Sequence, residues 1–162
     1  MTLDERDFRT ACGHFATGIT VVTIRGADGS PHGFTANSFT SVSLDPPLVL
    51  VCVDRRISSY EPLLQAEGFL VNVLSDLQEE TCRRFATADI DKFAGIQTSD
   101  GPFGAPRIEG CIAYIGARRV ARHEGGDHDI FVAEATEYEV RDGLPLLFFK
   151  GQYGLGGASE SR

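Results

Sequence analysis

The chain has 162 residues, of which 42% are hydrophobic and 23% are charged, as in an ordinary globular domain. Its 23 acidic residues outnumber the 15 basic ones, and the formal charge of −8 argues against nucleic acid or an anionic membrane as the main partner. This length predicts one domain over residues 1–162, in which the Gly/Ser-rich residues 154–162 form a flexible tail.

No stretch approaches the ~20 consecutive apolar residues of a membrane helix. Acidic residues at Asp4, Glu5 and Asp7 stand where a signal peptide carries positive charge, so we expect a cytoplasmic protein that spans no membrane. The four cysteines are far apart and no histidine pair has metal-ligand spacing, which predicts reduced, buried thiols and no metal site.

The first predicted element is a helix that begins at Thr2, because Thr2 and Glu5 have the spacing of a capping box. Apolar residues recur at helical intervals as far as Gly18, which ends the helix. From residue 19 the sequence is rich in β-branched residues, which is typical of strands. These strands are expected at 19–24, 33–37, 48–53 and 69–74, with 48–53 buried on both faces.

Two short helices are predicted between the strands, one from Ser59 and one opened by the pair Ser75 and Gln78. Residues 98–106 hold two glycines and two prolines, as a loop does. The remaining pattern predicts strands 112–122, 130–140 and 144–149, joined by turns at 125–128 and 142–143. Because strands outnumber helices and follow short turns, the expected fold class is mainly β, an antiparallel barrel with peripheral helices.

Common enzyme signatures are absent from the sequence. It has no Gly-x-Gly-x-x-Gly after a strand, no P-loop and no Gly-x-Ser-x-Gly elbow. A chain without its own nucleophile or metal can still be an enzyme when a cofactor carries the chemistry.

Residues 33–47 are the most informative segment, small and rich in hydroxyl and amide groups. Small side chains let a planar ligand approach the backbone, whose N–H and C=O groups can match a polar ring edge. Side chains such as Asn37 and Ser38 can both donate and accept hydrogen bonds. On composition alone, an ordinary polar loop that ends at a Pro-Pro turn explains the same residues.

Together with Leu-Val-Leu-Val-Cys-Val-Asp at 48–54, this segment resembles the flavin reductase component of two-component flavin-dependent monooxygenases. Further matches follow in order along nearly the whole chain, at 8–23, 69–74, 84–86, 126–128 and 149–153. The resemblance implies an FMN-binding split β-barrel, antiparallel and Greek-key-like, that binds FMN or FAD near the interface of a homodimer.

The resemblance also implies which residues bind the flavin. Residues 35–38 and 41–43 would follow the isoalloxazine, 52–54 the ring or ribityl chain, 58–59 the phosphate, and 84–85 the phosphate or adenylate. A helix that opens at Ser59 would favour a phosphate independently. The implied cofactor-binding residues are Thr35, Ala36, Asn37, Ser38, Ser41, Val42, Ser43, Cys52, Val53, Asp54, Ser58, Ser59, Arg84, Phe85, His128 and Tyr153.

His128, in Gly-Asp-His, is the implied catalytic residue, placed over the flavin and against the nicotinamide of NADH or NADPH. Its titration near neutral pH could then modulate hydride transfer. Considered without the resemblance, His128 is a solvent-facing residue of a turn, and Arg84 belongs to a solvated helix end. Tyr153 matches the residue with which the family makes its last contact to the dinucleotide, although Gln152 stands where relatives often have a basic residue.

The implied function is that of an NAD(P)H:flavin oxidoreductase that reduces FMN or FAD and supplies a separate oxygenase. The alternative is a non-reducing flavin- or haem-binding split-barrel protein, and an oxidase like those acting on pyridoxamine phosphate is a third. A nicotinamide contact at Gly-Asp-His argues against storage. The sequence leaves open the choices between FMN and FAD and between NADH and NADPH.

Overall fold

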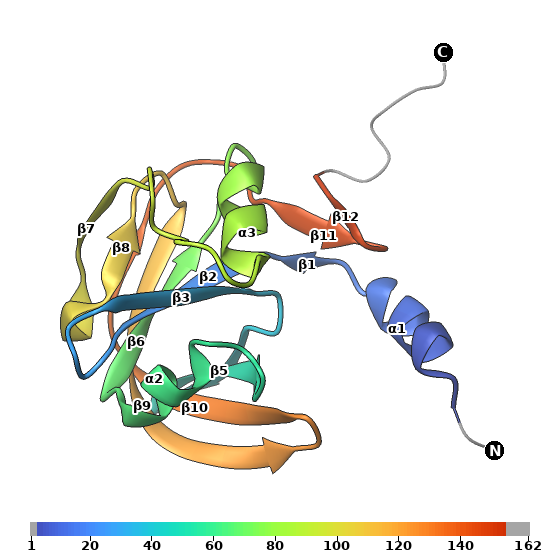
Figure 1. Cartoon of the computed structure of the whole chain (residues 1–162), viewed down its shortest axis with the longest axis horizontal. Helices are drawn as coiled ribbons and strands as arrows, with labels where there is room; N and C mark the ends of the chain where they lie inside the picture. Colours follow the sequence, from blue (N-terminus) through green and yellow to red (C-terminus); the bar gives the residue numbers. More distant parts are fainter. Residues whose placement is uncertain (1–2, 155–162) are drawn as a thin grey trace.

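The structure, a computed structural model, describes residues 3–154. Its main element is an antiparallel sheet of seven strands in the order β3-β2-β6-β9-β10-β5-β4, which bends round on itself without closing (Figure 1). The antiparallel split barrel expected from the sequence is thus confirmed. Its strands are β2 (Thr20–Arg25), β3 (Pro31–Ala36), β4 (Thr40–Leu44), β5 (Pro47–Asp54), β6 (Gly68–Val73), β9 (Ala113–Gly125) and β10 (His128–Val140).

Smaller elements surround this sheet. The pair β7 (Thr98–Asp100) and β8 (Pro106–Ile108) is joined by the 3-10 turn η1 (Pro102–Gly104). A separate small sheet contains β1 (Thr17–Gly18), β11 (Leu147–Phe149) and β12 (Gln152–Tyr153). The helices are α1 (Glu5–Gly13), α2 (Tyr60–Gln65) and α3 (Glu79–Ala86). Figure 1 shows α1 and the small sheet standing to one side of the barrel.

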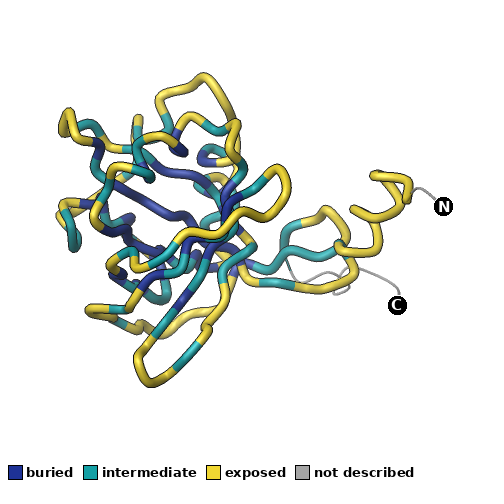
Figure 2. Tube along the Cα trace, turned by 90° about the horizontal axis from the view of Figure 1, so that it is seen from below, coloured by how far each residue is buried: buried dark blue, intermediate teal, exposed yellow. Residues whose placement is uncertain are grey.

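The hydrophobic core lies on both faces of strands β2 and β6. Val22 and Val71 belong to a cluster that is shared with β5 and α2, whereas Val21 and Leu70 belong to a second cluster that includes residues of α3 and β8. In Figure 2 the buried residues accordingly concentrate in the crossing strands, and the peripheral segments are exposed. Because a hydrophobic cluster covers each face of these strands, β2 and β6 have almost no exposed side chain.

The prediction that residues 48–53 are buried on both faces was wrong. In β5 only Val49, Val51 and Val53 are buried, and Leu48, Leu50 and Cys52 are partly accessible. A run of apolar residues does not reveal which face is covered, because only tertiary packing decides that. The uncovered face near the end of β5 is the one that leaves room for a ligand.

The first helix also differs from its prediction. It begins at Glu5, and the Asp4 side chain accepts hydrogen bonds from the backbone N–H groups of Arg6 and Asp7. It ends at Gly13, whereas Gly18 lies in β1. Thr2, the predicted cap, lies outside the described residues, as does the predicted tail beyond Gly154. Within the described chain no helix is long and apolar enough to cross a membrane.

Two further expectations of local structure were wrong for the same reason. Residues 98–106, predicted as a loop, contain β7 and η1, because pairing with β8 organises a segment that has no strand pattern of its own. The turn at 142–143 does not join a hairpin: β11 pairs with β1, which lies more than a hundred residues earlier. Strand pairing overrides the local signal in both places, with a near neighbour in the case of β7 and with a distant segment in the case of β11.

Candidate active site

A cavity of about 670 Å³ opens where β3 and β5 end, where β10 begins and where the chain leaves α3. Its lining combines small polar side chains, apolar side chains and charged side chains. It is lined by Phe34, Thr35, Ala36, Asn37, Ser38, Cys52, Val53, Asp54, Arg56, Ile57, Ser58, Phe85, Ala86, Ala88, Asp89, Lys92 and His128. This size falls within the range of small-molecule and cofactor sites.

Ten of the sixteen residues predicted to bind the cofactor line this cavity, although they come from five separate segments. They are Thr35, Ala36, Asn37, Ser38, Cys52, Val53, Asp54, Ser58, Phe85 and His128. The other six do not line it. Ser41, Val42 and Ser43 lie in the edge strand β4, so the segment 33–47 is the end of β3, a short connection and the whole of β4 rather than one loop.

Ser59, Arg84 and Tyr153 also lie outside the cavity. The Ser59 hydroxyl is buried and donates to the Gly33 carbonyl, and it makes no capping bond to α2. Arg84 Nη1 donates to the Asp91 carbonyl at 3.3 Å. Tyr153 packs in the small sheet with the Arg83 guanidinium over its ring, and burial raises its pKa to about 12. The predicted helix-end phosphate site at Ser59 is therefore not formed by its side chain.

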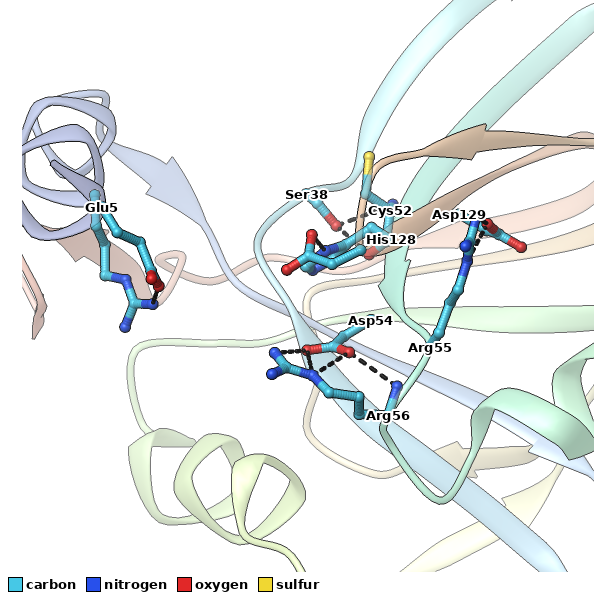
Figure 3. A network of polar contacts seen from close by, with 10 residues as sticks. Glu5, Ser38, Cys52, Asp54, Arg55, Arg56, His128 and Asp129 are labelled. Carbon is cyan, nitrogen blue, oxygen red and sulfur yellow. Dashed lines mark hydrogen bonds and ion pairs between the residues drawn. The ribbon is translucent and has the colours of Figure 1, made fainter. Parts of the chain in front are cut away.

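Asp54 and His128 are partners across the strands β5 and β10 (Figure 3), and both line the cavity. Both carboxylate oxygens of Asp54 accept hydrogen bonds from Arg56, at 2.7 to 3.2 Å. These bonds hold the pKa of Asp54 at about 2. His128 Nδ1 lies 2.7 Å from Asp127 Oδ1, which fixes the ring at the hairpin tip.

A second charged cluster lies on the opposite face of the same strands. The Asp129 carboxylate is buried and accepts from Arg55 Nε at 2.7 Å and from the Tyr60 hydroxyl at 2.5 Å. These hydrogen bonds lower the pKa of Asp129, and the bond from Tyr60 has the largest effect. The Arg55 backbone N–H also donates to the Asp127 carbonyl. The side chain and the backbone of Arg55 thus both join loop 55–58 to the hairpin that carries His128.

The inner wall is held by hydroxyl groups that bond to the protein itself. Ser38 Oγ donates to the Cys52 carbonyl at 2.9 Å and accepts from the Cys52 N–H at 3.1 Å (Figure 3). The hydroxyl thus makes the two hydrogen bonds that a neighbouring strand's backbone would make. Thr35 Oγ1 donates to the Cys82 carbonyl at 2.6 Å and ties β3 to α3. Burial raises the pKa of the Cys52 thiol, which is therefore protonated at neutral pH.

Sequence reasoning missed Lys92, which lines this cavity together with the guanidinium of Arg56. Its Nζ donates to the carbonyl oxygens of Gly33 and Phe85 at 3.2 and 3.0 Å, and burial lowers its pKa. Within residues 3–154 no carboxylate lies within ion-pair distance of it. One available signal was that Lys92 is one of only two lysines in the chain and precedes an aromatic residue.

The barrel and its cavity define a split-barrel protein with a ligand-sized cleft whose lining includes the cationic side chains of Arg56 and Lys92. A family model for the flavin reductase like domain matches residues 12–157. The chain therefore belongs to the flavin reductase-like family.

Individual relatives agree with this membership. The chain is 42% identical over 152 residues to the "Flavin-dependent monooxygenase, reductase subunit HsaB" of Rhodococcus jostii, covering 93% of this chain and 77% of that protein. It is 42% identical over 151 residues to the "FMN reductase (NADH) SmoA" of Agrobacterium fabrum, covering 93% and 86%.

A solved structure is similar over the whole barrel. It is that of the NADH:FAD oxidoreductase SgcE6 of Streptomyces globisporus in complex with NAD and FAD fragments, with a TM-score of 0.88. The identity is 37%, and the match covers 98% of this chain and 99% of that chain. The flavin reductase assignment made from the sequence is thereby confirmed.

Proposed function

We propose that this cavity binds FMN or FAD for reduction by NADH or NADPH, and that the reduced flavin serves a separate flavin-dependent oxygenase. The observation that carries the proposal is the convergence on one cavity of a polar turn, a Gly-Asp-His hairpin tip and an unpaired lysine. The relatives described as reductase subunits and NADH-dependent flavin reductases support the same activity.

The residues present fit a flavin phosphate ester. Small or flat side chains such as Ala36, Val53 and Phe85 leave space for a planar ring. Lys92, Ser58 and Arg56 stand together as donors for a phosphate, which prefers charge-assisted hydrogen bonds.

Each group then has a role that follows from its position. Because the hydroxyls of Thr35 and Ser38 already bond to the protein, the polar ring edge is left to Asn37 and the backbone of 35–38. His128 at the rim orients the nicotinamide, and its bond to Asp127 keeps it there. The bound flavin supplies the acceptor for a hydride from the nicotinamide. The protein's contribution is to hold the two rings in reacting geometry.

We also propose that the working unit is a homodimer in the cytoplasm. Helix α1 has no buried residue, and the apolar side chains of Phe8 on the helix and Leu3 just before it are exposed, so a second copy could cover them. Cys12, Cys52, Cys82 and Cys111 are free thiols, which suits a reducing compartment.

The experiment that tests the reductase function is anaerobic stopped-flow mixing of the protein, FMN or FAD, and NADH or NADPH. We expect rapid loss of the oxidised flavin band, slowed roughly ten- to a hundredfold by His128→Ala because the nicotinamide is no longer oriented. The matched control is His123→Ala, at an exposed histidine of β9 outside the cavity. Flavin that binds but is bleached by neither nicotinamide would instead favour the storage alternative.

A further inference from the structure

A buried carboxylate follows His128 directly in the chain. Asp129 is 1% exposed and belongs to the face of β10 that also carries the buried Phe131. Because side chains alternate along a strand, His128 belongs to the other face, where it lines the cavity proposed for the flavin. Figure 3 shows Asp129 together with Arg55, apart from the His128 ring.

Three donors from different elements surround this carboxylate. Arg55, in loop 55–58, donates through Nε at 2.7 Å, and Tyr60, in α2, donates through its hydroxyl at 2.5 Å. Arg122, in β9, completes the cluster with its Nη1 3.5 Å from Asp129 Oδ2. The Asp129 carboxylate thus ties the start of β10 to a loop, to a helix and to the neighbouring strand.

Stability alone does not account for a charge at this place. A buried ion pair recovers its desolvation cost only with good geometry, and apolar side chains of similar volume are often as stabilising. What the ion pair adds is direction, because charge-assisted hydrogen bonds are short and come from defined donors. A carboxylate held in this way fixes the backbone of Asp129, and with it the backbone of the residue before it.

His128 is held from both sides by one residue, Arg55. The Arg55 side chain bonds to Asp129, and the Arg55 backbone N–H donates to the Asp127 carbonyl at 3.3 Å. The His128 side chain is 40% exposed, and its Nδ1 lies 2.7 Å from a carboxylate oxygen of Asp127, which is itself exposed. Packing of the ring therefore does little to hold it, and its place depends on the backbone on either side.

We propose that Asp129 is a positioning residue, which holds His128 in place for the nicotinamide through its bonds to Arg55 and Tyr60. The inference rests on the proposed function, because it takes His128 as the residue that orients the nicotinamide. Since Asp129 lies outside the cavity, its effect on hydride transfer should pass through His128.

The first test observes the His128 ring in the full chain without flavin or nicotinamide, by nitrogen–proton correlation NMR of the histidine side chains. Tyr60→Phe removes the hydroxyl that bonds to Asp129 but keeps the buried ring. We expect this variant to shift or broaden the His128 signals, which are identified by their loss in His128→Ala. The signals of His14, on α1, should stay where they are.

The matched control is Tyr114→Phe. Tyr114 is also buried, and its hydroxyl also donates within the protein, to the Ile108 carbonyl at 2.7 Å, but it lies in β9 outside the cavity. This variant should lower the urea midpoint of unfolding about as much as Tyr60→Phe and leave the His128 signals unchanged. His128 signals that are the same in Tyr60→Phe as in the unaltered protein would overturn the proposal.

The second test is kinetic and uses the anaerobic reduction of FMN or FAD by NADH. Tyr60→Phe should slow the reduction roughly three- to tenfold, less than removal of the ring does, because a displaced His128 still orients the nicotinamide in part. The same substitution made in His128→Ala should change the rate by less than about twofold, since residues that act through one contact are not additive. Equal slowing in both backgrounds would show that Tyr60 and Asp129 do not act through His128.

Asp129→Asn addresses the carboxylate directly. It should give the same two results with a larger slowing, roughly tenfold or more, because both arginines lose the charge that holds them. If this variant does not fold, Tyr60→Phe alone decides the matter. Failure of the proposed function has a different signature, in which neither NADH nor NADPH reduces the flavin of the unaltered protein while the His128 signals still respond to Tyr60→Phe.

Discussion

At the scale of single residues, the anionic end of the ligand depends on Lys92. Lys92→Met keeps most of the side chain's volume but removes the charge, so we expect FMN to bind roughly ten- to a hundredfold more weakly, the loss of one hydrogen bond to a charged group. Riboflavin, which has no phosphate, should bind as before. Equilibrium dialysis with the two ligands measures both constants.

The comparison with riboflavin separates recognition of the phosphate from support of the fold. If both ligands lose affinity equally, Lys92 serves only to tie the segment after α3 to the Gly33 and Phe85 carbonyls. Lys150→Met, at the other lysine of the chain and outside the cavity, is the matched control and should change neither constant.

The site residues that could be predicted are those that the resemblance to the flavin reductase family picked out. The polar run 35–38 closes one strand, Cys52–Asp54 ends another, and His128 stands in a glycine turn, but their local patterns alone are equally those of an ordinary loop and turn. Lys92 could not be predicted, because its contact with Gly33 spans 59 positions and the intervening chain has no motif. Ser59 was expected to meet a phosphate, but only the structure shows its hydroxyl turned to the Gly33 carbonyl.

At the scale of elements, two Arg–Asp pairs on opposite faces connect loop 55–58 to β5 and β10. Asp54 and Asp129 both have pKa values below that of a free aspartate, Asp54 at about 2 because of its bonds from Arg56. A carboxylate with a depressed pKa stabilises the fold above the unfolded pKa of about 3.9, and that contribution is lost as pH falls through the folded pKa. We therefore expect the urea midpoint of unfolding to fall between about pH 4 and pH 2.

The Asp129→Asn variant tests which group causes this dependence. It removes one depressed carboxylate, so the midpoint should be lower than in the unaltered protein at pH 6, and the difference should shrink on acidification. Asp142→Asn, at an exposed aspartate that makes no ion pair within the described chain, is the control. A constant difference between Asp129→Asn and the unaltered protein across this range would show that Asp129 acts through packing alone.

The elements that could be predicted are those with strong local patterns. Strand β2 is a run of β-branched residues, and β9 and β10 flank a Gly-Gly-Asp turn, so their existence follows from local preferences. Local preferences did not reveal which face of each strand is covered by other elements. The α3 helix and the β7–β8 pair cover the outer face of β2 and β6, whereas the outer face of β5 stays open. This arrangement depends on contacts between distant segments.

At the scale of the whole molecule, the barrel is complete but α1 is not covered. Figures 1 and 2 show this helix beside the barrel with its surface exposed. The sequence predicted the helix from its amphipathic pattern, and such a pattern normally faces a core. The exposed fractions of Phe8 on the helix, 59%, and of Leu3 just before it, 77%, show that a single copy provides no such core.

A second copy is the partner that would give this helix a buried face, and Phe8→Asp tests it. In multi-angle light scattering the unaltered protein should have twice the chain mass of 17.5 kDa. The variant should approach the chain mass itself, because a buried aspartate without a partner opposes association. Val120→Asp, also at an exposed apolar side chain but on β9, should remain at the dimer mass. An unaltered protein that elutes at 17.5 kDa would contradict the dimer and leave α1 to a different partner, for which the oxygenase that receives the flavin becomes the first candidate.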